Sequence, residues 1–188
     1  MSTVITSRLS GLGELTLPGA GIGAATGVFA GIVTLGAGLP AGLAAVHLLA
    51  LGIPMALFGG FYTVLCARGV ARVGTFIPAA LLWLVGFPLG RVVQEASAAF
   101  YVAGTPDVGE PLWQFVVYNA VLSTGFAFGF IWLHDKMLPM WLNRIRAHNP
   151  HAEALMEAYT AYAAAMYAQK QRREARRTAL REARRKKP

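Results

Sequence analysis

The sequence predicts an all-α integral membrane protein with four transmembrane helices and a long, basic, cytoplasmic C-terminal helix. The 188 residues are 55% hydrophobic and only 14% charged, with a mean hydropathy of +0.48, whereas soluble domains carry about 25% charged residues. Apolar stretches of about twenty residues, the length that crosses a bilayer, recur along the chain. Residues 1–140 hold five basic and five acidic side chains, so the net charge of +8 belongs entirely to residues 141–188. We therefore expect a membrane domain at 1–140 and a basic tail at 141–188.

The first predicted span covers residues 17–39 and follows a short polar lead. Pro18 is tolerated there because it falls in a first helical turn. Four glycines recur at every fourth position, and positions four apart share one face of a helix. This glycine stripe, a glycine-zipper pattern, consists of Gly19, Gly23, Gly27 and Gly31. Small residues in such a row let a second helix approach closely, so the stripe predicts either a groove for a partner's helix or packing against another span of this chain.

A removable signal peptide would also combine an early arginine with an apolar run. The apolar run here is too long for that assignment, and Glu14 interrupts the approach to it. We therefore interpret the segment as a first span.

The second and third spans are predicted at residues 41–67 and 73–98. Pro54 removes one backbone hydrogen bond within the second span, so we expect a kink there. The end of the third span stays open. The helical pattern continues through Arg91, but the span could instead end near Gly90 and be followed by a short helix at the outer surface.

The fourth span is predicted at residues 112–133, with Trp113 and Trp132 placed as in the aromatic belts of a bilayer. The polar residues 134–136 then mark the water side, and residues 137–142 are interpreted as an interfacial step.

The tail begins with a helix-start signal, in which Asn149 is the N-cap and Pro150 the first helical residue. One helix should run from there to about Lys186. Its first half carries an apolar stripe at spacings of four, three and four. This tail stripe, a candidate docking surface, consists of Leu155, Tyr159, Tyr162 and Met166.

The second half of this helix is strongly basic, and its Lys and Arg side chains suit anionic lipid headgroups. A cytoplasmic protein, or RNA bound through phosphates, are the other partners considered, and nucleic acid is the least expected of the three. A solvated helix that only sets the topology is the remaining interpretation.

The positive-inside rule orients the predicted chain. The loop with Arg68 and Arg72 and the basic tail should be cytoplasmic, whereas the acidic loop with Asp107 and Glu110 and the uncharged turn at Pro40 should lie outside. Both termini are then cytoplasmic. The richness in Ala, Gly and Arg suggests a bacterial source, and hence a multi-pass protein of a bacterial inner membrane.

Three residues form a candidate intramembrane polar site, because ionisable groups are costly within a bilayer and tend to be functional there. Arg91 and Glu95 lie four residues apart and can pair on one helix face. His47 lies in the outer half of the second span. The alternatives are an Arg91 that snorkels to the outer surface and a His47 that only satisfies a helix interface.

Metal and catalytic motifs are not recognised. His148 and His151 have a metal-like spacing and His134 lies upstream, but Pro150 breaks the register and no cysteine or converging carboxylate accompanies them. We predict no catalytic residue, no metal site and no cofactor. The single cysteine, Cys66, leaves the redox compartment open.

These features predict a non-enzymatic accessory or assembly subunit of a larger inner-membrane complex, whose partners are other integral membrane subunits. A transport machine such as a lipid importer is the kind of complex we have in mind, by general likeness to small multi-span subunits and not by any shared motif. The alternative is a small self-assembling channel or transporter that uses Arg91, Glu95 and His47.

Overall fold

The computed structural model describes the backbone of residues 2–185 and the side chains of residues 11–179. The described chain is all-helical and has five helices: α1 (Ser2–Gly36), α2 (Ala41–Ala67), α3 (Phe76–Ala103), α4 (Leu112–Ile145) and α5 (Pro150–Arg185). The first four contain segments long and apolar enough to cross a membrane, which in α1 is Gly11–Gly36. The predicted set of four span-length helices and a fifth helix is confirmed at this level.

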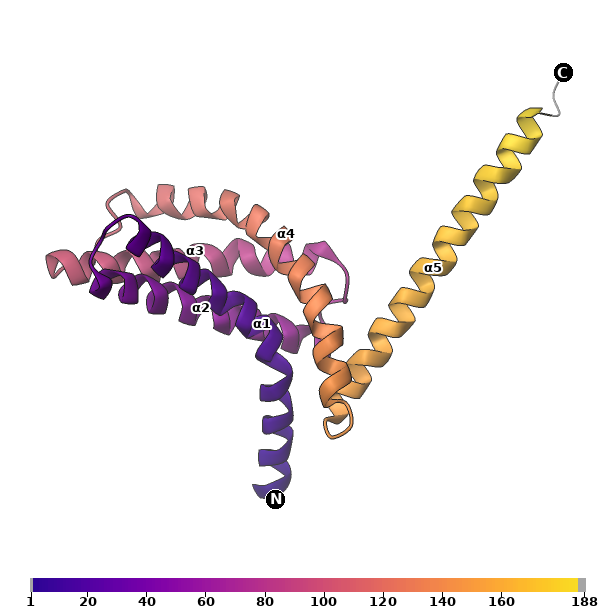
Figure 1. Cartoon of the computed structure of the whole chain (residues 1–188), viewed down its shortest axis with the longest axis horizontal. Coiled ribbons are helices and arrows are strands. Elements are labelled where there is room, and N and C mark those ends of the chain that lie inside the picture. Colours follow the sequence, from indigo (N-terminus) through magenta and orange to yellow (C-terminus); the bar gives the residue numbers. More distant parts are fainter. Residues whose placement is uncertain (1, 186–188) are drawn as a thin grey trace.

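Helices α1 to α4 form a bundle, and α5 projects from one end of it (Figure 1). In the bundle α1 packs on α2, α2 on α3 and α3 on α4. The turn at residues 37–40 and the loop at 104–111 lie at one end, and the α2–α3 loop lies at the end where α5 begins (Figure 1).

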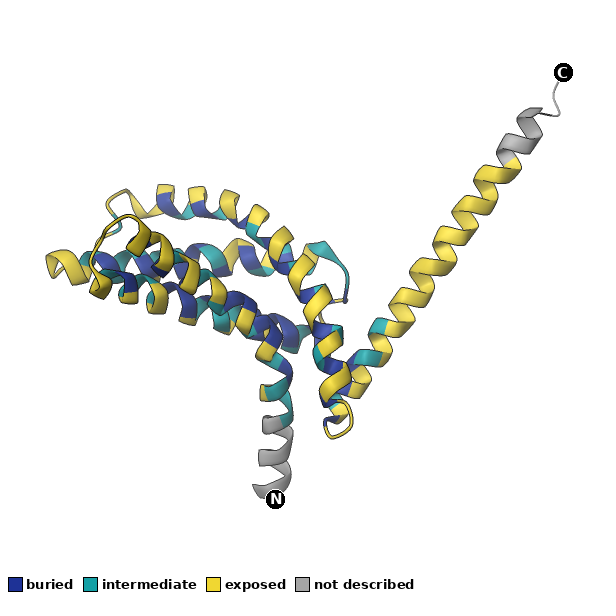
Figure 2. Cartoon of the chain, in the orientation of Figure 1, coloured by how far each residue is buried: buried dark blue, intermediate teal, exposed yellow. Residues whose placement is uncertain are grey.

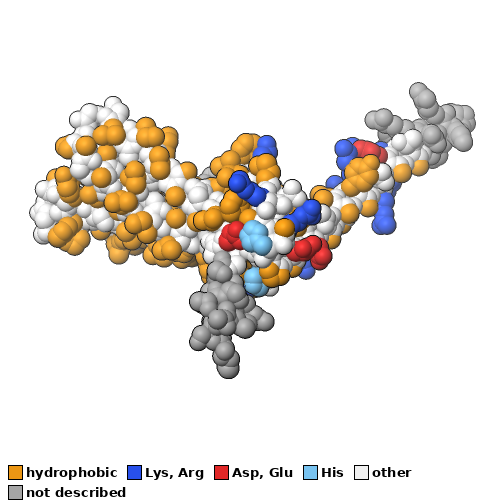
Figure 3. Space-filling view, turned by 60° about the horizontal axis from the view of Figure 1, so that its bottom comes forward, with side chains coloured by type: hydrophobic (Ala, Val, Ile, Leu, Met, Phe, Trp, Pro, Cys, Tyr) orange, Lys and Arg blue, Asp and Glu red, His pale blue; other side chains and the backbone are white. Residues whose placement is uncertain are grey.

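The outer surface of the bundle is rich in apolar side chains. Figure 2 shows exposed residues along the outward faces of the bundle helices, and Figure 3 shows many hydrophobic side chains on that surface. Phe29, Leu57 and Val121 are each about two-thirds exposed, at 67%, 69% and 70%. Monomeric soluble proteins rarely expose contiguous apolar surface on this scale.

The ends of α1 differ from the prediction. The backbone is already helical from Ser2, where a polar lead was expected, and Leu15, near the end of that lead, is fully buried. The helix ends at Gly36, before the expected residue 39. Gly38 has a φ of 75°, and the amide of Leu39 donates to the carbonyl of Thr34 at 3.2 Å, a glycine-based C-terminal cap that stops the helix.

Helix α3 begins at Phe76, three residues later than predicted, after a loop in which Gly69 and Gly74 have positive φ. It continues without interruption through Gly90 and Arg91 to Ala103. The alternative of a separate short helix after Gly90 is therefore wrong.

Helix α4 continues to Ile145, well beyond the predicted end at residue 133, and the expected interfacial step at 137–142 is helical. Pro139 lacks only one backbone donor and does not end the helix. The physical reason is an uninterrupted buried face whose residues follow one another at spacings of four or three. These residues are Phe115, Asn119, Ser123, Ala127, Phe130, His134, Leu138, Leu142 and Ile145.

Helix α5 begins at Pro150, as the sequence predicted. The side-chain oxygen of Asn149 accepts hydrogen bonds from the amides of His151 and Ala152, at 3.1 and 3.3 Å. Asn149 therefore satisfies two of the amides that a helix N-terminus leaves free.

Candidate functional site: a cavity with a polar end

A row of hydrogen-bonded polar side chains joins three helices near the end of the bundle that lies away from α5. We call His47, Arg91, Gln94 and Asn119 the polar row. A guanidinium nitrogen of Arg91 donates to the side-chain oxygen of Gln94, and the amide of Gln94 lies 2.9 Å from Nδ1 of His47. Nε of Arg91 donates to Oδ1 of Asn119 at 3.4 Å. Buried polar groups in an apolar bundle need such partners.

Arg91 keeps hydrogen-bonding capacity beyond this row. Its Nη2 lies 3.6 Å from a carboxylate oxygen of Glu95, one turn further along α3, and its guanidinium lies 5.9 Å from the centre of the Phe115 ring. A guanidinium has five N–H donors, and these contacts occupy about three of them. The Arg91 side chain is 29% exposed, so the remaining donors can meet a ligand.

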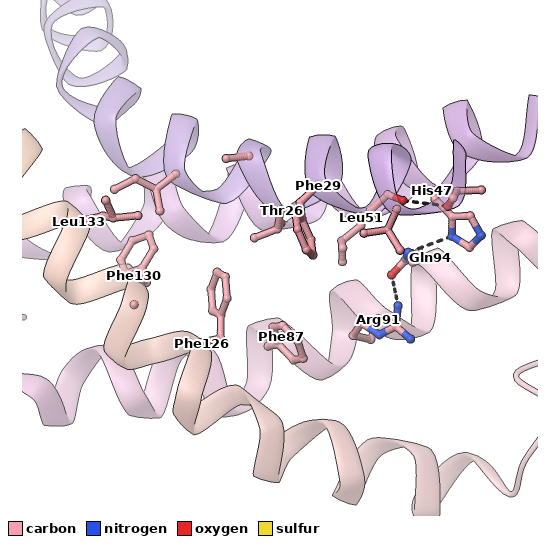
Figure 4. A pocket seen from close by; sticks show the side chains of 16 residues that line it. Thr26, Phe29, His47, Leu51, Phe87, Arg91, Gln94, Phe126, Phe130 and Leu133 are labelled. Atoms are coloured by element: carbon pink, nitrogen blue, oxygen red, sulfur yellow. Dashed lines mark hydrogen bonds between the residues drawn. The ribbon is translucent and has the colours of Figure 1, made fainter. Parts of the chain in front are cut away.

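Three residues of the polar row, His47, Arg91 and Gln94, close one end of a cavity of about 650 Å³ (Figure 4). Four helices contribute to its wall, which is mostly apolar. The lining residues are Ile22, Ala25, Thr26, Phe29, Ala30, Val33 and Thr34 of α1, His47 and Leu51 of α2, Phe87, Arg91 and Gln94 of α3, and Phe126, Gly129, Phe130 and Leu133 of α4. The hydroxyls of Thr26 and Thr34 are occupied by backbone carbonyls of their own helix.

The structure connects all three residues of the predicted polar site. Arg91 pairs with Glu95, as their spacing predicted, and Gln94 is the bridge from Arg91 to His47. His47 and Arg91 both line the cavity, whereas Glu95 is absent from its wall. Sequence reasoning missed Gln94 and Asn119. The signal that could have found them is their polarity within otherwise apolar span-length segments, because a buried amide is expensive unless it is paired.

Comparisons with known proteins found no relative whose site could be compared with this one. No family model matches the chain, and no curated protein or solved structure shows significant similarity to it. The function of the chain is therefore inferred from its own residues and their geometry.

The glycine stripe lies against α2. A methyl group built at Gly19 would overlap the carbonyl of Gly59, and one built at Gly23 would overlap the carbonyl of Met55. Gly27 faces the backbone of Gly52 in the same way. A methyl group built at Gly31 would lie 3.2 Å from its nearest atoms, in Ala44 and Leu48. The packing of α1 against α2 is therefore less close toward the 37–40 turn. Of the two uses considered for the stripe, the structure shows packing within the chain.

A buried polar pair lies between α2 and α4. His134, which the sequence suggested as a water-side residue, is fully buried. Its Nε2 is 3.1 Å from the hydroxyl of Thr63, and its Nδ1 has no hydrogen-bond partner among the residues that the structure describes. Tyr62 and Phe130 pack against its ring, with centroids 5.0 and 5.5 Å away. The water-side assignment was therefore wrong for His134, because α4 continues and turns this residue inward.

A second polar cluster ties the start of α1 to the end of α4. Pro18 has no N–H and leaves the carbonyl of Glu14 without its usual helical donor, and the indole N–H of Trp141 donates to that carbonyl at 2.9 Å. The Glu14 carboxylate accepts from His148 at 2.9 Å and from the Asn149 amide at 3.1 Å. We call Glu14, Trp141, His148 and Asn149 the α1–α4 joint.

The histidine pair considered for a metal falls at this joint. His148 binds Glu14, and among the described residues no group of three His, Cys, Asp or Glu side chains is arranged to hold a metal ion.

The tail stripe is divided between the bundle and the solvent. Leu155 is 3% exposed, and the hydroxyl of Tyr159 donates to Asp135 of α4 at 3.3 Å. Burial, with the Asp135 charge beside it, raises the pKa of Tyr159, so the phenol stays protonated and can donate. Tyr162 reaches the carbonyl of Gly74 at 3.3 Å, whereas Met166 is exposed. Three of the four residues of the predicted docking stripe thus contact this chain's own bundle, and Met166 alone among them is left to the solvent.

Proposed function

We propose that α1 to α4 cross a bacterial inner membrane and that the protein is a non-enzymatic accessory or assembly subunit of a larger membrane complex, docked through α5. Two features support insertion: the span length of the four helices and the apolar outer surface of the bundle. A lipid environment covers such a surface without exposing it to water.

The distribution of charge supports cytoplasmic termini. The hydrogen bond between Tyr162 and Gly74 places the root of the basic tail beside the loop that holds Arg68 and Arg72. The loop with Asp107 and Glu110 lies at the opposite end of the bundle (Figure 1). The positive-inside rule counts Lys and Arg close to the spans and gives acidic residues little weight, so the basic residues at the end where α5 begins support a cytoplasmic location for that end.

Cysteine labelling on intact cells tests this topology. In a Cys66→Ala background, a cysteine at Val108 should react with a membrane-impermeant thiol reagent, and a cysteine at Thr178 should react only after lysis. Labelling of Thr178→Cys from outside would contradict the proposed orientation.

The single observation that carries the subunit role is the exposure of α5. Every residue from Thr160 to Ala179 is exposed, and the 36 residues of the helix make it about 54 Å long at 1.5 Å per residue. Contacts within this chain support only its first turns. Most helical stability in proteins comes from packing of one face, so a partner surface supports the rest.

The exposed part of α5 has a pattern suited to a helical partner. Alanine occurs at every seventh position, and a seven-residue repeat keeps one face of a helix against another. These positions are Ala154, Ala161, Ala168 and Ala175. Met166 and Tyr167 add exposed apolar surface elsewhere on the helix. The occupant we propose is a helix of a cytoplasmic or membrane-bound partner protein.

Affinity purification of the tagged full chain in mild detergent, followed by mass spectrometry, tests the docking. We expect distinct subunits to co-purify, and we expect Ala168→Glu or Met166→Glu to lose them. Gln169→Glu is the matched control, because it adds a carboxylate to the exposed part of α5 between the alanine face and the side that carries Met166 and Tyr167. Recovery of the same partners with both variants, or of the chain alone as a homo-oligomer, would refute the proposal.

A small channel or transporter is the second candidate. The observation that favours it is the polar row, in which His47, Gln94 and Arg91 are joined through hydrogen bonds. Ion flux through liposomes that hold only this chain, and its loss in Arg91→Gln, would favour the channel over the accessory role.

A further inference from the structure

The cavity between α1 and α4 opens sideways from the bundle. Its α1 wall includes Phe29 and Val33, which are 67% and 52% exposed, and its α4 wall includes Leu133, which is 38% exposed. The hydrogen bonds between α1 and the end of α4 lie at the α1–α4 joint, at the far end from Arg91. With the bundle in a bilayer, the opening faces the acyl chains. A lipid-facing role for the cavity therefore rests on the proposed membrane insertion.

The size of the cavity suits a small ligand. Its volume of about 650 Å³ falls within the range of about 300–1,000 Å³ that such ligands occupy, and a flexible hydrocarbon chain can follow its long apolar wall.

The polar end of the cavity selects the charge of the occupant. Arg91 supplies guanidinium donors, and Gln94 and His47 lie beside it. The Glu95 carboxylate, the one that pairs with Arg91 among the described residues, does not line the cavity. A guanidinium with free donors binds phosphate oxygens through charge-assisted, often paired hydrogen bonds.

Arg91 lies in the half of the bundle nearer the 104–111 loop. Its guanidinium contacts Phe115 and Asn119, which lie three and seven residues into α4 from Leu112, and Arg91 itself lies twelve residues before the end of α3 at Ala103. At 1.5 Å per residue, these positions are about 5, 10 and 18 Å from the helix ends at that side. With the 104–111 loop outside, a phosphate held by Arg91 belongs to a lipid of the outer leaflet.

We propose that the cavity binds one anionic phospholipid of the outer leaflet, with its phosphate on Arg91 and one acyl chain along the apolar wall between α1 and α4. The polar row positions the guanidinium. The bound lipid fills the space between α1 and α4, and the protein therefore binds anionic phospholipids in preference to neutral ones.

Photocrosslinking of the full chain in vesicles tests the site. One set of phosphatidylcholine vesicles contains phosphatidylglycerol with a diazirine near the end of one acyl chain, and the other contains phosphatidylcholine with the same reactive chain. We expect crosslinks to gather on residues 25–33 and 126–133, with a preference for phosphatidylglycerol of at least about tenfold. Arg91→Gln should abolish that preference.

Two glycines of α4 provide a matched pair of variants that leaves Arg91 intact. A Cβ at Gly129 or at Gly125 meets nothing within 4 Å, but only Gly129 lines the cavity. Gly129→Leu should therefore reduce the cavity crosslinks from both lipids severalfold, whereas Gly125→Leu should leave them unchanged.

Several outcomes would overturn the lipid site. They are equal yields from the two lipids, crosslinks spread evenly over the outer faces of α2 and α3, or no effect of Gly129→Leu. Flotation after an alkaline wash, performed before irradiation, separates the two proposals. A chain that is washed off the vesicles refutes membrane insertion and this site with it, and a chain that floats without selective crosslinking refutes only the lipid site.

Discussion

Gly23→Ala tests the seam between α1 and α2 most sharply. A single methyl group there would overlap the carbonyl of Met55 and the peptide nitrogen of Ala56, which are backbone atoms of the neighbouring helix. They cannot rotate away as the end of a side chain would, so the two helices must separate. Gly21 offers a control on the same helix, because a Cβ at Gly21 meets nothing within 4 Å.

The expected change in the free energy of unfolding follows from two opposing effects. Overpacking typically costs about 1–3 kcal/mol, and the upper value applies because backbone opposes backbone along the seam. Replacing glycine by alanine within a helix gains about 1 kcal/mol. Gly23→Ala should therefore lower the free energy of unfolding by about 2 kcal/mol, whereas Gly21→Ala should raise it by about 1 kcal/mol.

Thermal unfolding of the purified subunit in detergent measures both variants. For a chain of this size, 1 kcal/mol corresponds to about 2–4 °C in Tm. Gly23→Ala should melt about 4–8 °C below the wild type and Gly21→Ala about 2–4 °C above it. Insertion should be unaffected, because the apolar length of α1 is unchanged. A Tm for Gly23→Ala at or above the wild-type value would show that the seam is not closely packed.

Three further substitutions test the buried polar contacts. Trp141→Phe should cost about 1–3 kcal/mol in thermal unfolding, because the carbonyl of Glu14 loses its donor, whereas Trp113→Phe at an exposed site should change little. Asn149→Ala should cost about 1–2 kcal/mol and speed hydrogen exchange in the first turn of α5; unchanged exchange there would contradict the capping role. Thr63→Val keeps the side-chain shape but removes the partner of the buried histidine, so a loss of about 1–3 kcal/mol is expected, and unchanged stability would mean that the pair contributes nothing.

Local signals were sufficient for much of the fold. Hydrophobicity is a property of composition over about twenty residues, so the four span-length helices could be predicted without knowledge of what they contact. The start of α5 was predictable for a similar reason, since Asn149 and Pro150 cap a helix through bonds to residues only two or three positions away.

The ends of the helices were less predictable, because packing decides them. Residues 134–145 contain a histidine, charges and a proline, which suggested that α4 had ended. Leu138 and Leu142 are nevertheless fully buried, in a hydrophobic cluster that also contains Leu15 of α1 and Leu155 of α5. The energy of that burial outweighs the single hydrogen bond that Pro139 cannot make.

The sequence by itself determined an all-helical chain of four span-length apolar segments, a basic tail and a row of glycines that permits close approach of another helix. Only the tertiary structure decided that α2 occupies the glycine row, that Gln94 and Asn119 join His47 to Arg91, and that a cavity lies between α1 and α4. The physical reason is distance along the chain. Helix formation and capping depend on neighbours within a turn or two, whereas a cavity and a polar row depend on how segments dozens of residues apart are brought side by side.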